Sequence, residues 1–138
     1  MQEVISASPQ AVWHVLTAPE HIAQWLGTQV RSKWKPGAPI VFAFTWEGQS
    51  FEDKGRILRL EPLHAFSYSY WSGLSGLPDE PASYSVIAFV ITPDGGSVRL
   101  ALRHDHLTSQ TMYEHSKANW VETLRTIKTL SESTVPRA

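Results

Sequence analysis

The stretch that decides the fold is 111–130, TMYEHSKANWVETLRTIKTL, near the C-terminus. Mostly apolar residues recur in it at spacings of four and three, which is typical of one face of an α-helix. The residues on this face are Met112, Ser116, Trp120, Leu124 and Ile127. Most of the charged residues lie on the other side. The spacing therefore predicts one long amphipathic helix that must bury its apolar face against another layer.

Upstream of this helix, apolar and polar residues alternate in the two-residue repeat of β-strands. Turn residues separate the strands at 35–37, 47–49 and 93–96, and 72–81 is predicted to be a loop. Strands joined by short turns are antiparallel. The alternation predicts about six strands, at Val4-Ile5, 40–46, 51–60, 66–70, 84–92 and 98–103.

Two short helices are expected before these hairpins. Ser8 can cap the first with its hydroxyl, and Pro9 suits the first helical position because its missing N–H has no partner there anyway. Pro19 ends that helix and begins a second one, which ends near Gly27. The order of elements predicts an α+β fold in which an antiparallel sheet is covered by the C-terminal helix, the only element long enough to do so.

Composition limits the possible functions. The 138 residues fit a single domain, 1–138, and 15 aromatic residues can fill a sizeable core. The formal net charge of -1 argues against nucleic acid as a partner. No apolar run is long enough to span a membrane, and the N-terminus lacks the pattern of an export signal. We therefore expect a cytoplasmic protein, and the absence of cysteine excludes disulfides and thiol chemistry.

Recognisable motifs occur in order over nearly the whole chain. They are ISASPQAVW (5–13), Leu16-Thr17, PEHIAQW (19–25), GRIL (55–58) with Glu61-Pro62, PDGG (93–96) with VRLALRH (98–104), and Asn119-Trp120 with Leu124 and Lys128. Together they resemble the family named after the C-terminal domain of the activator of the heat-shock-protein-ninety ATPase. That family belongs to the START-like, birch-pollen-allergen-like (polyketide cyclase) superfamily, and its name links it to the stress response.

The resemblance implies a helix-grip fold, in which a curved sheet wraps the C-terminal helix and often leaves an apolar cavity between them. Three positions depart from the family pattern. Ala18 stands where an Asp cap is usual, Leu26 replaces the second residue of a Trp-Trp pair, and Asn119 replaces a Gly before Trp120. The second helix is therefore expected to start less firmly than in the family pattern.

A ligand-binding cavity under the C-terminal helix is the leading functional hypothesis. Ligand pockets are mostly apolar with a few polar groups that fix orientation. Ser116 and Asn119 are unusual for a dry core, because buried polar groups need partners. The predicted cavity residues are Trp25, Phe42, Phe44, Phe66, Tyr68, Tyr70, Phe89, Leu100, Leu102, Met112, Ser116, Asn119 and Trp120. The alternative is that these side chains simply fill a core.

Other chemistries have weaker support in the sequence. His104 and His106 would share a face of a strand and could approach one metal, with His64 or His115 as a further ligand. Acid–base catalysis of the cyclase or hydrolase kind would use the histidines or the carboxylates Glu47, Glu52 and Asp53. No nucleophile or phosphate-binding motif occurs. We predict no metal and no cofactor.

The expected partner is a small apolar or aromatic molecule. An enzyme using the same cavity and a chaperone-linked interaction domain remain alternatives, and the sequence does not settle whether catalysis occurs. Some apolar residues alternate onto the opposite strand face, where antiparallel sheets usually carry polar residues. They are Val41, Ala43, Ala88 and Val90. This face indicates a possible homodimer.

Overall fold

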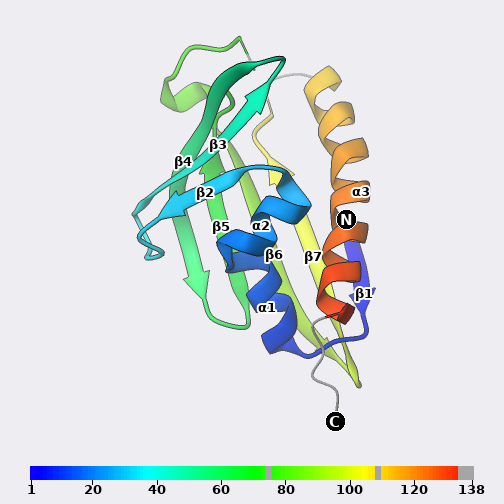
Figure 1. Cartoon of the computed structure of the whole chain (residues 1–138). Coiled ribbons are helices and arrows are strands. Elements are labelled where there is room, and N and C mark those ends of the chain that lie inside the picture. Colours follow the sequence, from blue (N-terminus) through cyan, green and yellow to red (C-terminus); the bar gives the residue numbers. More distant parts are fainter. Residues whose placement is uncertain (74–75, 108–109, 134–138) are drawn as a thin grey trace.

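The structure is a computed structural model that describes residues 1–73, 76–107 and 110–133, with only the backbone of 110–113 and 115 (Figure 1). Seven strands form one antiparallel sheet in the order β1-β7-β6-β5-β4-β3-β2. The strands are β1 (Gln2–Ile5), β2 (Gln29–Ser32), β3 (Pro39–Trp46), β4 (Gln49–Glu61), β5 (Ala65–Tyr70), β6 (Ser85–Asp94) and β7 (Ser97–Asp105). The helices are α1 (Pro9–Thr17), α2 (Pro19–Leu26) and α3 (Gln110–Ser133), with a 3-10 turn η1 (Pro81–Ser83).

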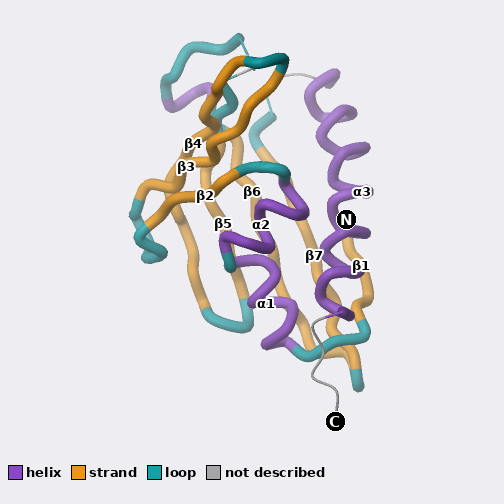
Figure 2. The backbone as a smooth tube through the Cα atoms, viewed as in Figure 1, coloured by secondary structure: helices purple, strands orange, loops and turns teal. Residues whose placement is uncertain are grey.

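All three α-helices lie against one face of the curved sheet (Figure 2). The predicted α+β helix-grip fold is therefore confirmed. None of the helices in the described ranges is long and apolar enough to cross a membrane. α3 begins and ends slightly beyond the predicted bounds.

The N-terminal helices begin and end as their sequences predict. Ser8 Oγ accepts a hydrogen bond from the Ala11 N–H at 3.1 Å, and Pro9 occupies the first turn of α1. α2 has Ala18 as its N-cap residue, which makes no side-chain hydrogen bond to the helix, in line with the departure from the family pattern. It ends at Gly27, whose φ of 73° requires the left-handed conformation that glycine adopts readily.

The core lies between the sheet and all three helices. Phe66 and Phe89 stack at 6.2 Å in its centre, and Trp25 of α2 meets Phe89 edge to face at 5.9 Å. α1 adds Val12 and Val15 to the same cluster. The expectation that the C-terminal helix alone covers the sheet is therefore wrong, because two short helices together cover an area that a single helix cannot reach.

α3 is held to the sheet along its C-terminal half. Trp120, Leu124 and Ile127 are buried, as their spacing predicts. Lys128 Nζ donates to the Val4 carbonyl on β1 at 2.7 Å, which joins the end of the helix to the edge strand. This half of α3 is thus fixed both by apolar packing and by a charged hydrogen bond.

Two features of the sheet differ from the sequence expectation. β2 is a seventh strand that we did not predict, because it has four residues of which only Val30 is buried, and its pairing with β3 decides its conformation. Phe44 was expected to face the helix. It lies half-buried near the end of the β3–β4 hairpin, where it stacks on its cross-strand partner Phe51 at 5.7 Å, because this end of the hairpin extends beyond α1 and α2 (Figure 1).

The opposite face of the sheet keeps the apolar residues noted in the sequence. Val41, Ala43 and Ala88 are half-buried, and Val90 is 40% exposed. Single exposed apolar side chains are normal on a protein surface. The homodimer stays a prediction, for which the mass of the protein in solution is the decisive measurement.

Candidate functional site

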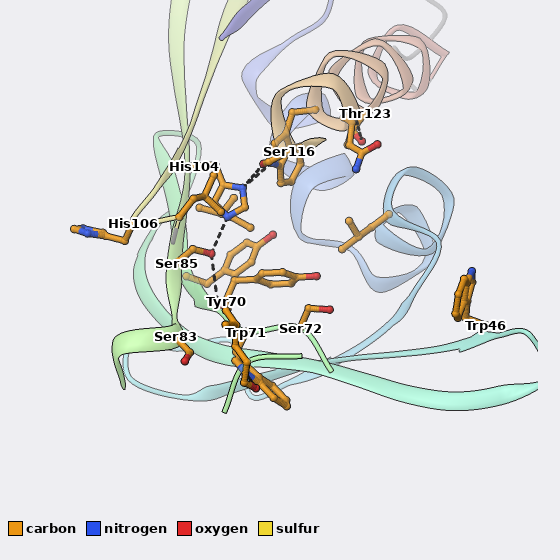
Figure 3. A pocket seen from close by; sticks show the side chains of 17 residues that line it. Trp46, Tyr70, Trp71, Ser72, Ser83, Ser85, His104, His106, Ser116 and Thr123 are labelled. Atoms are coloured by element: carbon orange, nitrogen blue, oxygen red, sulfur yellow. Dashed lines mark hydrogen bonds between the residues drawn. The ribbon is translucent and has the colours of Figure 1, made fainter. Parts of the chain in front are cut away.

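A cavity of about 780 Å³ lies at one end of the sheet, between strands β5–β7, α3 and the loop after β5 (Figure 3). Its wall is mostly apolar and aromatic, with hydroxyl, amide and imidazole groups among them. The size falls within the range of cavities that hold small organic ligands. The described lining residues are Leu26, Trp46, Tyr68, Tyr70, Trp71, Ser72, Leu77, Ser83, Ser85, Ile87, His104, His106, Leu107, Ser116, Asn119, Trp120 and Thr123.

His104 is the centre of a hydrogen-bond network in the cavity wall (Figure 3). Its Nδ1 lies 2.5 Å from Ser116 Oγ and 3.1 Å from Trp120 Nε1, both on α3. Its Nε2 lies 2.7 Å from Ser85 Oγ on β6. The imidazole therefore connects the last strand of the sheet, its neighbour and the C-terminal helix.

The donors in this network fix the tautomer of His104. An indole N–H can only donate, so Nδ1 must accept from Trp120, and the proton of the neutral ring is on Nε2. Nε2–H then donates to Ser85, whose hydroxyl donates onward to the Tyr70 carbonyl at 3.3 Å. The Ser116 hydroxyl also donates a hydrogen bond to Nδ1, so it shares the lone pair of this nitrogen with the Trp120 N–H. Both ring nitrogens are thus engaged by protein groups.

Burial lowers the pKa of His104 from its ordinary 6.5 to about 4, and the charge of Asp105 opposes only part of this shift. A proton on Nδ1 would also face the Trp120 N–H, which has no lone pair to accept it. The imidazole is therefore neutral at neutral pH.

We expect the free energy of unfolding to fall as the pH is lowered from 6.5 towards 4. In that window the unfolded state binds the His104 proton and the folded state does not, so acid favours unfolding. The full shift would correspond to about 3.4 kcal/mol, and partial exposure of the ring reduces our expectation to about 2 kcal/mol. Urea unfolding at a series of pH values measures it.

Carboxylates also titrate in this window, so the comparison needs matched variants. His104→Gln should remove about 2 kcal/mol of the pH dependence, whereas His64→Gln, at an exposed turn position, should leave it unchanged. Identical pH profiles for the wild-type protein and His104→Gln would show that His104 does not carry this dependence.

A second polar group lies behind the tyrosines of β5. Asp53 on β4 is only 6% exposed. Its carboxylate accepts hydrogen bonds from the Tyr70 hydroxyl and, at 3.0 Å, from the Gly73 N–H. A buried carboxylate requires such donors, because desolvation of a charge is costly. Tyr70 is therefore oriented with its proton toward Asp53, and the Ser72 side chain hydrogen-bonds to the same hydroxyl.

The hydroxyl of Tyr68 differs from that of Tyr70 in its hydrogen bonding. Tyr68 is 1% exposed, and its hydroxyl has no hydrogen-bond partner within the described part of the chain. Burial raises the pKa of both Tyr68 and Tyr70 well above the ordinary value, and the negative charge of Asp53 adds to each shift. Both groups remain phenols, and Tyr68 keeps a proton that it can donate.

The structure divides the residues that the sequence predicted for a cavity. Those that line the cavity are Tyr68, Tyr70, Ser116, Asn119 and Trp120. The side chain of Met112 is outside the described residues. Another group lies away from this cavity, mostly in the packed core, namely Trp25, Phe42, Phe44, Phe66, Phe89, Leu100 and Leu102. The sheet residues of this core do not line it because α1 and α2, with Trp25 among their side chains, fill the middle of the sheet, and Phe44 lies apart in the β3–β4 hairpin.

Sequence reasoning did not include Ser85 and His104 among the cavity residues. Both extend the row of inward-facing residues on their strand, because Ser85 precedes Ile87 and Phe89 on β6 and His104 follows Leu100 and Leu102 on β7. The register pairs Ile87 with His104 and Tyr70 with Ser85. Polar residues at the end of an apolar strand face were therefore the available indication of this site.

The shared strand face considered for His104 and His106 does not form. β7 ends at Asp105, and His106 has a φ of 63°, so its side chain points away from His104 (Figure 3). In the described part of the chain no group of three or more His, Asp or Glu residues could hold a metal. The side chain of His115 lies outside that part.

The carboxylates considered for acid–base catalysis lie elsewhere. Glu47 is exposed in the β3–β4 turn, and Glu52 pairs with Arg31 at 2.7 Å on the surface. Asp53 is buried behind Tyr70. None of the described cavity-lining residues is a carboxylate.

Comparison with known proteins agrees with this architecture. The model of the family "Activator of Hsp90 ATPase homolog 1-like protein" matches residues 6–132. The chain belongs to this family. The match covers α1, α2, all of α3 except Ser133 and every described strand except β1, so the resemblance of the sequence motifs is confirmed. None of the curated proteins compared matches the chain.

Several solved structures share the fold. The solution structure of ChR145 from Cytophaga hutchinsonii is 35% identical over 96% of this chain and 92% of that one, with a TM-score of 0.83. CalU16 from Micromonospora echinospora is 22% identical over 94% of this chain and 73% of that one, with a TM-score of 0.73. A structure described as the Aha1 dimer from Colwellia psychrerythraea is 17% identical over 96% of this chain and 93% of that one, with a TM-score of 0.71. The last two show likeness of fold alone.

Proposed function

We propose that this member of the family binds a small apolar or aromatic molecule in the cavity beside His104. The observation that carries the proposal is a cavity of about 780 Å³ with a mostly apolar, aromatic wall and convergent polar groups. A filled core would leave no such space, whereas ligand sites combine apolar walls with few oriented polar groups. The rigid network around His104 supports this reading, because preorganised walls reduce the entropic cost of binding.

Binding is favoured over catalysis by the state of the polar groups. A general base needs a free lone pair near the substrate proton. His104 accepts from Trp120 and Ser116 with one nitrogen and donates to Ser85 with the other. Asp53 is occupied by Tyr70 and Gly73. These groups are positioned to shape and orient rather than to transfer a proton.

The test is the binding of an uncharged aromatic probe to a protein whose cavity has been filled. N-phenyl-1-naphthylamine fluoresces more strongly in apolar surroundings and is expected to bind the wild-type protein. Thr123 lines the cavity from α3, and Thr123→Phe should place a ring within it. We expect the affinity to fall by about tenfold or more, which corresponds to about 1.4 kcal/mol.

Thr126→Phe is the matched control. Thr123 and Thr126 both donate their hydroxyls to the carbonyl four residues earlier, and Thr126 is exposed and does not line the cavity. The two substitutions therefore lose the same helix contact, and Thr126→Phe should bind the probe as the wild-type protein does. Equal binding by both variants would rule out this cavity as the binding site.

A further inference from the structure

We propose that the cavity selects uncharged molecules that carry a hydrogen-bond acceptor, and that it discriminates against anions. The inference rests on the proposed function and names the class of ligand that the same site would take. It follows from three properties of the wall: the absence of charge in its described lining, the buried carboxylate behind it, and the unpartnered hydroxyl of Tyr68.

The described lining contains no Asp, Glu, Lys or Arg that could neutralise a charged ligand. Of its two histidines, His104 is held in its neutral form by its hydrogen bonds, and His106 points away from His104 (Figure 3). An ion that enters such a wall loses hydration without gaining a partner of opposite charge. An uncharged molecule of the same shape avoids that cost.

The buried carboxylate makes the tyrosine end of the cavity unfavourable for anions in particular. Asp53 contacts the Tyr70 hydroxyl directly. Its charge is felt at both phenols, since it raises the pKa of Tyr68 as well as that of Tyr70. A ligand carboxylate beside these hydroxyls would face a like charge in surroundings of low dielectric constant.

Tyr68 supplies the positive preference for an acceptor. Tyr68 is one of the lining residues, and its buried hydroxyl has no partner within the described part of the chain. A buried donor without a partner costs free energy that a suitable ligand atom can recover. A carbonyl or ether oxygen would accept this proton.

One cation lies on the outside of the rim, but it is already paired. Lys54 Nζ is 5.5 Å from the centre of the Trp71 ring. It also lies 2.5 Å from the Asp79 carboxylate, and both side chains are substantially exposed. This ion pair is screened by water and has no net charge, so it does not reverse the preference of the interior.

Three probes of matched size test the inference by competition with N-phenyl-1-naphthylamine at pH 7.5. They are methyl 2-naphthoate, 2-naphthoate and 2-isopropylnaphthalene, which carry an uncharged acceptor, a negative charge and no acceptor, respectively. We expect the ester to bind at least about tenfold more tightly than the carboxylate. It should also bind about fivefold more tightly than the hydrocarbon, which is typical of one hydrogen bond.

Tyr68→Phe separates the hydrogen bond from shape. The variant keeps the ring, and it loses no hydrogen bond within the described chain, so the fold should be retained. The ester's advantage over the hydrocarbon should disappear in this variant. Tyr84→Phe is the control, because Tyr84 donates to Asp79 outside the cavity. It should leave all three affinities unchanged.

The outcomes are distinct. A carboxylate that binds as tightly as the ester would overturn the selection against anions and leave the proposed function standing. An ester advantage that persists in Tyr68→Phe would overturn the role of Tyr68. If N-phenyl-1-naphthylamine and all three probes fail to bind, the proposed function falls and the inference falls with it.

Discussion

Gly55→Ala is expected to lower the free energy of unfolding by about 3 kcal/mol or more. A Cβ at this position would lie 1.6 Å from the Ser69 carbonyl oxygen on the neighbouring strand β5. Backbone at this distance cannot be moved aside as a flexible side chain can. The strands would have to separate, which would break the paired hydrogen bonds between Lys54 and Trp71 at 2.9 and 2.8 Å. Urea unfolding at neutral pH measures the loss.

Gly96→Ala is the matched control, because a Cβ there would meet nothing within 4 Å and the residue is outside the left-handed region. Its free energy of unfolding should stay within about 0.5–1 kcal/mol of the wild type. A Gly55→Ala protein as stable as Gly96→Ala would show that β4 and β5 do not approach as closely as described.

Trp120→Ala is expected to cost about 3–5 kcal/mol, the usual range for deleting a buried tryptophan side chain. Trp120 is 7% exposed and packs edge to face on Phe89 at 5.8 Å. Its indole also donates to His104 Nδ1 at 3.1 Å. The substitution therefore opens the core and removes one of the donors that hold the imidazole neutral. Unfolding in urea gives the first effect, and NMR titration of His104 gives the second as a rise of its pKa.

Val121→Ala tests whether the effect belongs to the helix in general. Val121 is the next residue of α3 and is 42% exposed. Its replacement should change the free energy of unfolding by less than about 0.5 kcal/mol. Comparable losses at both positions would contradict the assignment of Trp120 as the anchor of the helix.

Much of the fold follows from local patterns. Alternation over 40–46 and 66–70 and the helical repeat of Trp120, Leu124 and Ile127 each require one buried face, so they predict the elements correctly. β2 was missed because a short strand with one buried side chain has too weak a pattern. The covering role of α1 and α2 was underestimated, since a repeat predicts a buried face but not the partner against which it packs.

The candidate site could be predicted less completely from the sequence than the fold could. Alternation placed Phe42, Phe66 and Phe89 on the same face as Tyr68 and Tyr70, but it cannot separate the filled middle of the sheet from its open end. Ser116 was recognised as unusual on a helical face, and its partner His104 could not be assigned. The two are brought together only by the packing of α3 on β7.

The sequence by itself determined the order of the elements except β2, the family and the buried half of the C-terminal helix, because periodicity and caps act over a few residues. Tertiary structure alone decided which end of the sheet is hollow and which polar groups meet there. Trp120 fixes the tautomer of His104, and Asp53 engages Tyr70 while Tyr68 is left without a partner. These relations join residues far apart in the chain, and they depend on burial and direction, which no local pattern contains.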